Sequence, residues 1–268
     1  YNGGVALTGG TTSTIYAFNP TLGAVNNVVI GGAAGIGPVT GATGNLLISG
    51  LAAATNLQTP TGTVSFTGIG NTYGTTTITN AIMNIGGISG AAGAGSGTFT
   101  GTGAFTLNQS GVLTIDNSQG SNNSNRMSAA NFTSTGGSIN LLSFNAATAL
   151  SQTIGTLALS GGDTTINVTR GASTLNADLT ITNAPTRSNG AVINYIGTTG
   201  TLGTAGNNPH ILFSTGTPTL NDNLIGGWAT VGGSDFATYG ADGVAATTYS
   251  ATLITGSTAA TDNINVSL

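Results

Sequence analysis

The chain has 268 residues, of which 38% are hydrophobic and only 4% are charged, and it contains 45 glycines and no cysteine. Its three basic and seven acidic residues give a formal net charge of −4, which excludes nucleic acid as a partner because so few cations cannot neutralise a phosphate backbone. The absence of cysteine excludes a disulfide framework, and the combination of low charge with this hydrophobic content is unlike a disordered chain.

Helices are disfavoured along the whole chain, because Lys and Glu are absent while Gly, Thr, Asn and Ser dominate. Residues 1–60 show a repeat least clearly, and we expect them to form an N-terminal cap or assembly segment continuous with the rest of the body. Residues 61–268 are predicted to be β-solenoid repeats that become rich in aromatic residues toward the C-terminus. The longest apolar stretches are far shorter than a membrane span, so we expect no membrane insertion by this segment.

Short bursts of alternating apolar and polar residues, separated by Gly, Ser and Asn, indicate strands with one buried face. Their core residues recur in two series. The first series recurs every 26 or 27 residues and contains Leu113, Ile139, Ile166 and Ile193. The second recurs every 22 to 27 residues and contains Phe105, Phe132, Leu157 and Leu179.

Periods of this length are typical of stacked repeats, in which one unit cannot bury its apolar face alone. The prediction is an all-β fold, a right-handed parallel β-helix (β-solenoid), with two strands and a turn in each unit. An antiparallel β-sandwich is the alternative, since short strands and Gly-rich turns also fit it. Asn and Gly are expected at the corners, where positive φ is tolerated, with stacked asparagines bonded to one another along the rod.

One segment, residues 64–78 (VSFTGIGNTYGTTTI), resembles the repeat of the autotransporter-associated β-strand repeat proteins, although it lacks the Thr-Gly pair that usually follows the tyrosine. Weaker resemblances follow in the same order as in that family. They are Gly111–Ser118 with Asn125-Arg126, Gln152–Leu157, and Ile225–Thr230 with Asp235–Tyr239. The resemblance implies an exported bacterial surface protein with a β-helical passenger, and it carries over no catalytic residue.

No catalytic site is expected from the residues themselves. A polysaccharide-degrading β-helix would need paired carboxylates or a base near a metal, and the predicted register scatters Asp116, Asp163 and Asp178 over different positions. The single histidine, His210, is interpreted as a polar turn residue just before a strand. We therefore predict that the chain is not an enzyme, with a polysaccharide-degrading enzyme as the less favoured alternative.

Neither a cofactor nor a metal ion is expected. Asp222, Asp235 and Asp242 lie in the last quarter of the chain, but no calcium-binding loop motif surrounds them, and they are interpreted as turn caps. Trp228 fits either core packing or a carbohydrate-binding platform, with core packing favoured.

The C-terminal segment 262–268 alternates like a strand and has no Lys or Pro to protect its edge. We expect this edge, through Ile264, Val266 and Leu268, to pair with another copy of the chain or with a further piece of the same polypeptide. The predicted function is an extracellular or cell-surface structural protein that self-assembles end to end into a filament, fibre or surface layer. A monomeric adhesin or glycan-binding passenger is the alternative, with surface glycans as its partners.

Overall fold

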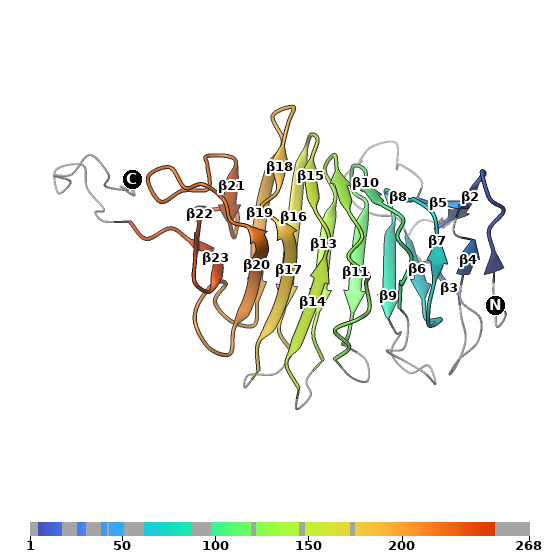
Figure 1. Ribbon diagram of the computed structural model, residues 1–268, viewed down its shortest axis with the longest axis horizontal. Coiled ribbons are helices and arrows are strands. Elements are labelled where there is room, and N and C mark those ends of the chain that lie inside the picture. The colour runs from blue at the N-terminus through green and yellow to red at the C-terminus, as the bar shows by residue number, and fades with distance from the viewer. Residues whose placement is uncertain are drawn as a thin grey trace.

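The computed structural model describes residues 5–17, 26–30, 39–41, 43–50, 62–86, 98–118, 122–144, 148–171 and 175–249. All regular secondary structure in these ranges is β-strand, and none of them contains a helix that could span a membrane. The strands lie side by side along an elongated body, with successive turns of the chain stacked from one end to the other (Figure 1). The predicted parallel β-helix is confirmed.

The longest sheet contains ten of the described strands. The first eight pair in parallel, each with the equivalent strand of the next turn of the chain. The strands of this sheet are β3 (Asn26–Ile30), β6 (Gly62–Phe66), β9 (Ile82–Gly86), β11 (Val112–Asp116), β13 (Ser138–Leu142), β16 (Asp163–Thr169), β19 (Val192–Thr198), β21 (Ala229–Val231), β22 (Asp235–Gly240) and β23 (Gly243–Ala246).

A second sheet of seven parallel strands forms another face of the rod. Its strands are β2 (Thr12–Tyr16), β5 (Asn45–Ser49), β8 (Thr76–Thr79), β10 (Phe105–Leu107), β12 (Phe132–Ser134), β15 (Leu157–Leu159) and β18 (Thr186–Arg187). The third face is built from two three-stranded sheets. The first holds β1 (Val5–Ala6), β4 (Val39–Gly41) and β7 (Thr72–Tyr73), and the second holds β14 (Leu150–Ile154), β17 (Ala177–Asn183) and β20 (Pro209–Gly216).

The predicted unit of two strands is therefore incomplete, because many turns of the chain add a third strand. Isolated parallel bridges from Asn71 to Phe99 and from Phe99 to Met127 continue the third face between its two sheets. Gln152 extends this line, since its side-chain amide donates to the Met127 carbonyl at 3.1 Å in a position where a strand would otherwise pair. The third face is more irregular than the other two, which explains why its strands were not recognised in the sequence.

Tight turns connect the seven-stranded sheet to the ten-stranded sheet at one corner of the rod. Asn80, Ser110, Gly162 and Asn189 occupy these turns with φ between 50° and 62°. The left-handed conformation lets the chain change direction within a few residues, and Asn and Gly adopt it at low energetic cost. The expectation that Asn and Gly favour the corners is thus confirmed. Near the start of strands in the seven-stranded sheet, asparagine side chains bond to threonine of the next turn: Asn45 Oδ1 accepts from Thr75 at 2.8 Å, and Asn131 repeats the pattern with Thr156 at 2.9 Å.

The core is a column of inward-facing side chains from all three faces, with an aromatic series through its middle. Phe99 contacts both Tyr73 and Phe105 with ring centroids 5.0 Å apart, and Phe105 stacks on Phe132 at 5.1 Å. These rings are buried and come from consecutive turns of the chain. Aromatic pairs at such distances add to the stability that area burial provides.

The predicted register is correct over three turns and wrong at the fourth. Leu113 pairs with Ile139 and Ile139 with Ile166, but Ile166 then pairs with Tyr195, while Ile193 pairs with Thr164. The error is two residues, which keeps the same side-chain face and so left the alternation unchanged. In the second series Phe105, Phe132 and Leu157 pair as predicted. Leu179 does not belong to this series, because it lies on the third face between Gln152 and Ile211.

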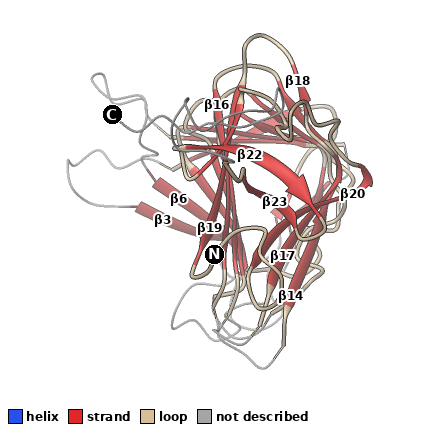
Figure 2. Ribbon diagram, turned by 90° about the vertical axis from the view of Figure 1, so that its left-hand side faces the viewer, coloured by secondary structure: helices blue, strands red, loops and turns tan. Residues whose placement is uncertain are grey.

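The strands of the first 60 residues that the structure describes pair in parallel with the strands that follow them. The opposite end of the rod changes pattern, because β21, β22 and β23 pair antiparallel. In Figure 2, which faces this end, β22 and β23 lie across the opening of the β-helix. Tyr239 of β22 stacks on Phe213 at 4.9 Å, and its hydroxyl accepts from the Phe213 amide at 2.9 Å. This hairpin covers the end of the core, and the sequence did not predict it.

The aromatic column predicts a large difference between buried and exposed phenylalanines. Phe132→Ala is expected to lower the free energy of unfolding by about 3–5 kcal/mol, because it leaves a cavity beneath Phe105. Phe236 is 42% exposed, so the matched control Phe236→Ala is expected to change stability by about 1 kcal/mol or less. Chemical denaturation followed by circular dichroism measures both, and equal losses would contradict the column as the centre of the core.

Tyr195 predicts how stability depends on pH. Burial raises the pKa of Tyr195 well above its usual value, and its hydroxyl has no hydrogen-bond partner. The phenol stays protonated in the fold but ionises in the unfolded chain above pH about 10. Below that pH the Tyr195 phenol therefore adds nothing to the pH dependence of stability. Above it, the free energy of unfolding falls by about 1.4 kcal/mol per pH unit.

Tyr195→Phe is expected to lose less stability between pH 8 and pH 11 than the unmodified chain. At pH 8 the variant is expected to be more stable by about 1 kcal/mol, because it removes an unpaired buried hydroxyl. Tyr16→Phe is the control, since Tyr16 is 68% exposed and should leave both values unchanged. Denaturation curves at the two pH values test this, and an unchanged pH dependence in Tyr195→Phe would show that the phenol ionises equally in both states.

Candidate functional site

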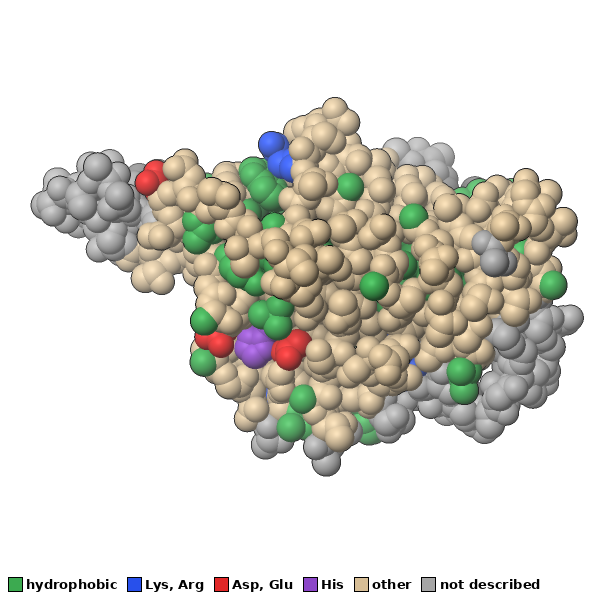
Figure 3. Space-filling model, in the orientation of Figure 1, with side chains coloured by type: hydrophobic (Ala, Val, Ile, Leu, Met, Phe, Trp, Pro, Cys, Tyr) green, Lys and Arg blue, Asp and Glu red, His purple; other side chains and the backbone are tan. Residues whose placement is uncertain are grey.

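The surface of the rod carries few charges, as Figure 3 shows for one face: most of it is backbone and uncharged polar side chains. Charged side chains are therefore the main candidates for catalytic or binding groups. Three arrangements stand out among the described residues: a pair of Asp178 and His210 on the third face, a buried arginine at a corner, and a polar groove around Asp163.

His210 lies within β20, which corrects its interpretation as a turn residue before a strand. The residue is 8% exposed, and its Nδ1 lies 2.7 Å from Oδ1 of Asp178 on the neighbouring strand β17. Its Nε2 lies 3.0 Å from the backbone carbonyl oxygen of Thr204. Both ring nitrogens thus face oxygen acceptors, and both hydrogen bonds form together only when each nitrogen carries a proton. The pair fastens the loop of residues 199–208 to the third face.

A serine completes a row with these two residues, but not in the order of a catalytic triad. Ser151 of β14 pairs with Asp178, and Asp178 pairs with His210. In a Ser-His-Asp triad the histidine stands between the other two and takes the proton of the serine hydroxyl. Here the aspartate stands in the middle and Nε2 of His210 is held by Thr204. The geometry is that of a structural hydrogen-bonded pair.

Arg126 is fully buried at the corner that follows β11. Its Nε donates to Oδ1 of Asn117 at 2.5 Å. Burial lowers the pKa of Arg126 to about 10, and the nearby charge of Asp116 opposes that shift. Asp116 is itself held in the turn, since it accepts from the Ser118 amide at 2.8 Å. The guanidinium stays charged at neutral pH and organises the corner from inside, where no substrate reaches it.

The other predicted acidic positions lie apart from one another. Asp116 and Asp163 belong to the ten-stranded sheet, whereas Asp178 belongs to the third face, so the expectation that these three do not form one patch is confirmed. Asp222 occupies a left-handed turn with φ of 49°, and Asp235 accepts from the hydroxyl of Tyr249 at 3.3 Å. Within the described ranges no group of three His, Cys, Asp or Glu side chains lies close enough to hold a metal ion.

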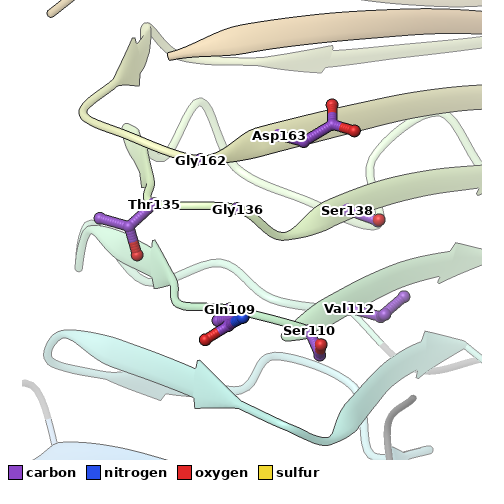
Figure 4. Close-up of a pocket in the computed structure, with 8 residues that line it drawn as sticks. All are labelled: Gln109, Ser110, Val112, Thr135, Gly136, Ser138, Gly162 and Asp163. Carbon is purple, nitrogen blue, oxygen red and sulfur yellow. The ribbon is translucent and has the colours of Figure 1, made fainter. Parts of the chain in front are cut away.

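A groove runs along the corner where the tight turns stack. It consists of two hollows of about 480 Å³ and 260 Å³ that meet at Asp163. The larger hollow lies over the turns that precede β11, β13 and β16, and Figure 4 shows Val112, Ser138 and Asp163 in a row along one side of it. The smaller hollow continues over β19 and β21 and ends at Trp228. Glycine allows neighbouring turns to approach closely here, because a Cβ on Gly162 would lie 2.5 Å from the Thr135 carbonyl oxygen.

The polar groups of the groove are held in place by the turns beneath them. Asn194 Oδ1 accepts from the Gly233 amide at 2.8 Å and from the Thr230 hydroxyl at 3.2 Å. These bonds orient the Asn194 amide and leave its amino group without a hydrogen-bond partner among the described residues. Asp163 is exposed at the junction of the two hollows, and its carboxylate likewise makes no hydrogen bond to the described part of the chain.

Trp228 forms one wall of the groove. It is half-buried, and it packs against the hydrophobic core from outside. The guanidinium of Arg187 lies 5.6 Å from the centroid of its ring, and Nε of Arg187 donates to the Ala191 carbonyl at 2.5 Å. The aromatic residues near the C-terminus are therefore of two kinds. Tyr195 and Phe213 are buried, whereas Trp228 packs against the core and is also partly exposed at the surface.

The predicted assembly residues Ile264, Val266 and Leu268 lie outside the described residues, so their pairing stays a prediction. The sequence missed both the groove and the Asp178–His210 pair. The pair was hidden by the misplacement of Leu179, because aligning Leu179 with Ile211 puts Asp178 directly beside His210. Comparison of the chain with protein-family models, with curated proteins and with solved structures gives no match.

The Asp178–His210 pair is expected to stabilise the fold. Asp178→Ala and His210→Ala should each lower the free energy of unfolding by about 1–3 kcal/mol, because each leaves a partly buried polar group without its hydrogen-bond partner. The double variant should lose less than the sum of the two, with a coupling of about 1 kcal/mol or more. Denaturation of the four proteins measures this cycle, and additive losses would show that the two side chains do not interact in solution.

Proposed function

We propose that this protein is an extracellular structural rod that self-assembles end to end into a filament, fibre or surface layer. The observation that carries the proposal is the difference between the two ends of the described β-helix. One end is covered by the hairpin of β22 and β23, while the other presents the outer edges of β2 and β3, which pair with no other described strand.

The outer edge of β2 offers backbone groups in the pattern that a further parallel strand needs. The Asn45 amide donates to the Thr11 carbonyl, and the Ala17 amide donates to the Ser49 carbonyl, both at 2.9 Å. Odd-numbered residues of β2 therefore direct their backbone groups toward β5. Even-numbered residues, Thr14 among them, direct theirs away from the rod. Such an edge is a template for another chain unless it is blocked, and the sequence has no Lys with which to block it.

The proposed occupant of this edge is the alternating segment 262–268 of another copy, through Ile264, Val266 and Leu268. Pairing of this kind is head-to-tail, and a head-to-tail contact that does not close into a ring produces a filament. The alternating pattern of the segment supports this role, because it matches a strand with one buried face.

The extracellular location is supported by the composition and by the resemblance to autotransporter-associated β-strand repeat proteins. A chain with three arginines and no lysine offers few cleavage sites to trypsin-like proteases, and a continuous ladder opens only locally. Both properties suit a protein exposed outside the cell. An adhesive, glycan-binding role is the second candidate, and the groove at Asp163 is the observation that favours it.

Thr14→Pro is expected to abolish filaments while leaving the rod folded. Proline removes an amide that faces away from β5, so it blocks the edge without breaking the ladder to β5. Thr14→Val, which keeps the amide, is the matched control and should assemble like the unmodified chain. Electron microscopy and sedimentation measure assembly, and circular dichroism checks the fold. Filaments of normal length from Thr14→Pro, or dispersed rods from the unmodified chain, would contradict the proposal.

A further inference from the structure

The groove at the corner of the rod has the size and shape for an extended ligand. Its lining residues come from the turns before β11, β13 and β16 and the first residues of these strands, from the start of β19, and from β21 with its flanking loops. Neighbouring strands lie about 4.8 Å apart, so five successive turns give the groove a length of roughly 19 Å along the rod. A chain-like molecule that lies parallel to the rod axis would contact all five turns.

The side chains that line the groove determine which kind of chain-like ligand fits it. Hydroxyl and amide groups come from Gln109, Ser110, Thr135, Ser138, Asn194 and Thr230. Each of these groups can both donate and accept hydrogen bonds, as the hydroxyls of a sugar do. An aromatic surface lies at one end, where Val192 is 39% exposed and Trp228 forms the wall, and the larger hollow adds the apolar side chain of Val112. A peptide with several large apolar side chains would therefore meet mostly polar groups along the groove.

Charge gives a second criterion. Among the residues that the structure describes, Asp163 is the sole charged one that lines either hollow, and it lies at their junction. An anionic chain would place its own charges against this carboxylate without a lining cation to balance them. Arg187 stands over the Trp228 ring and donates through Nε to the Ala191 carbonyl, but it is not among the residues that line either hollow. A neutral ligand with several hydroxyls instead gives Asp163 donors for both carboxylate oxygens.

From these observations we propose that the groove binds a neutral oligosaccharide along the rod axis, with its hydroxyls on Asp163 and Asn194 and one sugar ring against Trp228. The oriented amide of Asn194 donates through its amino group, and the Asp163 carboxylate accepts. The indole supplies the apolar surface that the C–H face of a sugar ring needs. This inference gives a chemical identity to the surface glycan partner of the proposed function. It does not depend on end-to-end assembly, because the groove lies on the side of the rod.

The test uses Trp228 as a built-in reporter, since it is the only tryptophan of the chain. The full chain is titrated with the neutral hexasaccharides of β-1,4-glucan, β-1,4-mannan and β-1,4-xylan, and with hexagalacturonate as an anionic comparison. Fluorescence emission and calorimetry follow binding. At least one neutral hexasaccharide is expected to shift the emission and to saturate, and hexagalacturonate is expected to bind at least 10-fold more weakly.

Asp163→Asn and Asn194→Ala are each expected to weaken binding by 10-fold or more, and Trp228→Phe, followed by calorimetry, by a smaller factor. Asp242→Asn is the matched control, because Asp242 lies in the turn between β22 and β23 and should leave affinity unchanged. Circular dichroism verifies that every variant is folded. Absence of binding to all neutral hexasaccharides, equal or tighter binding of hexagalacturonate, or unchanged affinity in Asp163→Asn and Asn194→Ala would overturn the proposal.

Assembly is followed in the same samples by electron microscopy. The groove variants are expected to form filaments like the unmodified chain, whereas Thr14→Pro should keep its affinity for the oligosaccharide. Loss of binding with intact filaments in Asp163→Asn, and loss of filaments with intact binding in Thr14→Pro, would separate the two roles. Loss of both properties in either variant would overturn the independence of the groove from the rod ends.

Discussion

The parallel hydrogen-bond ladder is the constraint on which the rest of this structure depends. Each strand must sit in register with the strand one turn before it, so inward positions lie over inward positions along the whole rod. The length of chain per turn is free to vary, since successive paired residues of the ten-stranded sheet are 36 positions apart between Val28 and Val64 but only 19 apart between Val64 and Met83. Loops absorb this difference outside the ladder.

The fold class could be read from the sequence because the ladder imposes a local pattern. Alternation marks the buried face of each strand, and Leu113, Ile139 and Ile166 recur at a nearly constant spacing. The predicted register is wrong between Ile166 and Tyr195, where the turn of the chain is longer. The alternation gave no warning, because an error of two residues preserves it. The third face was hidden for another reason. Isolated bridges at Phe99 and Met127, and the side-chain amide of Gln152, take the place of strand-to-strand pairing there, so this face has no continuous series of regular strands.

The candidate sites could not be predicted to the same degree, because they depend on neighbours across turns. Asp178 and His210 meet only when β17 and β20 are aligned correctly, and the residues between them in sequence give no sign of the pair. The groove is assembled from short turns of five successive coils, none of which carries a motif of its own. Sequence periodicity identifies what is repeated, whereas these sites arise where one turn differs from its neighbours.

The scarcity of charge connects the core, the surface and the groove. Because the rod has so few ionic groups, hydroxyls and amides form the hydrogen bonds of its outer surface, as between Asn45 and Thr75 and between Asn131 and Thr156. With only three basic residues in the chain, an acidic side chain on such a surface meets few opposite charges that compete with a ligand. Asp163 lies at the centre of the groove under these conditions, while Arg126, Asp178 and His210 are engaged in holding the fold. Among the described residues, the same composition that builds a rod of few charges leaves the Asp163 carboxylate without a hydrogen bond, at the position where the proposed oligosaccharide would bind.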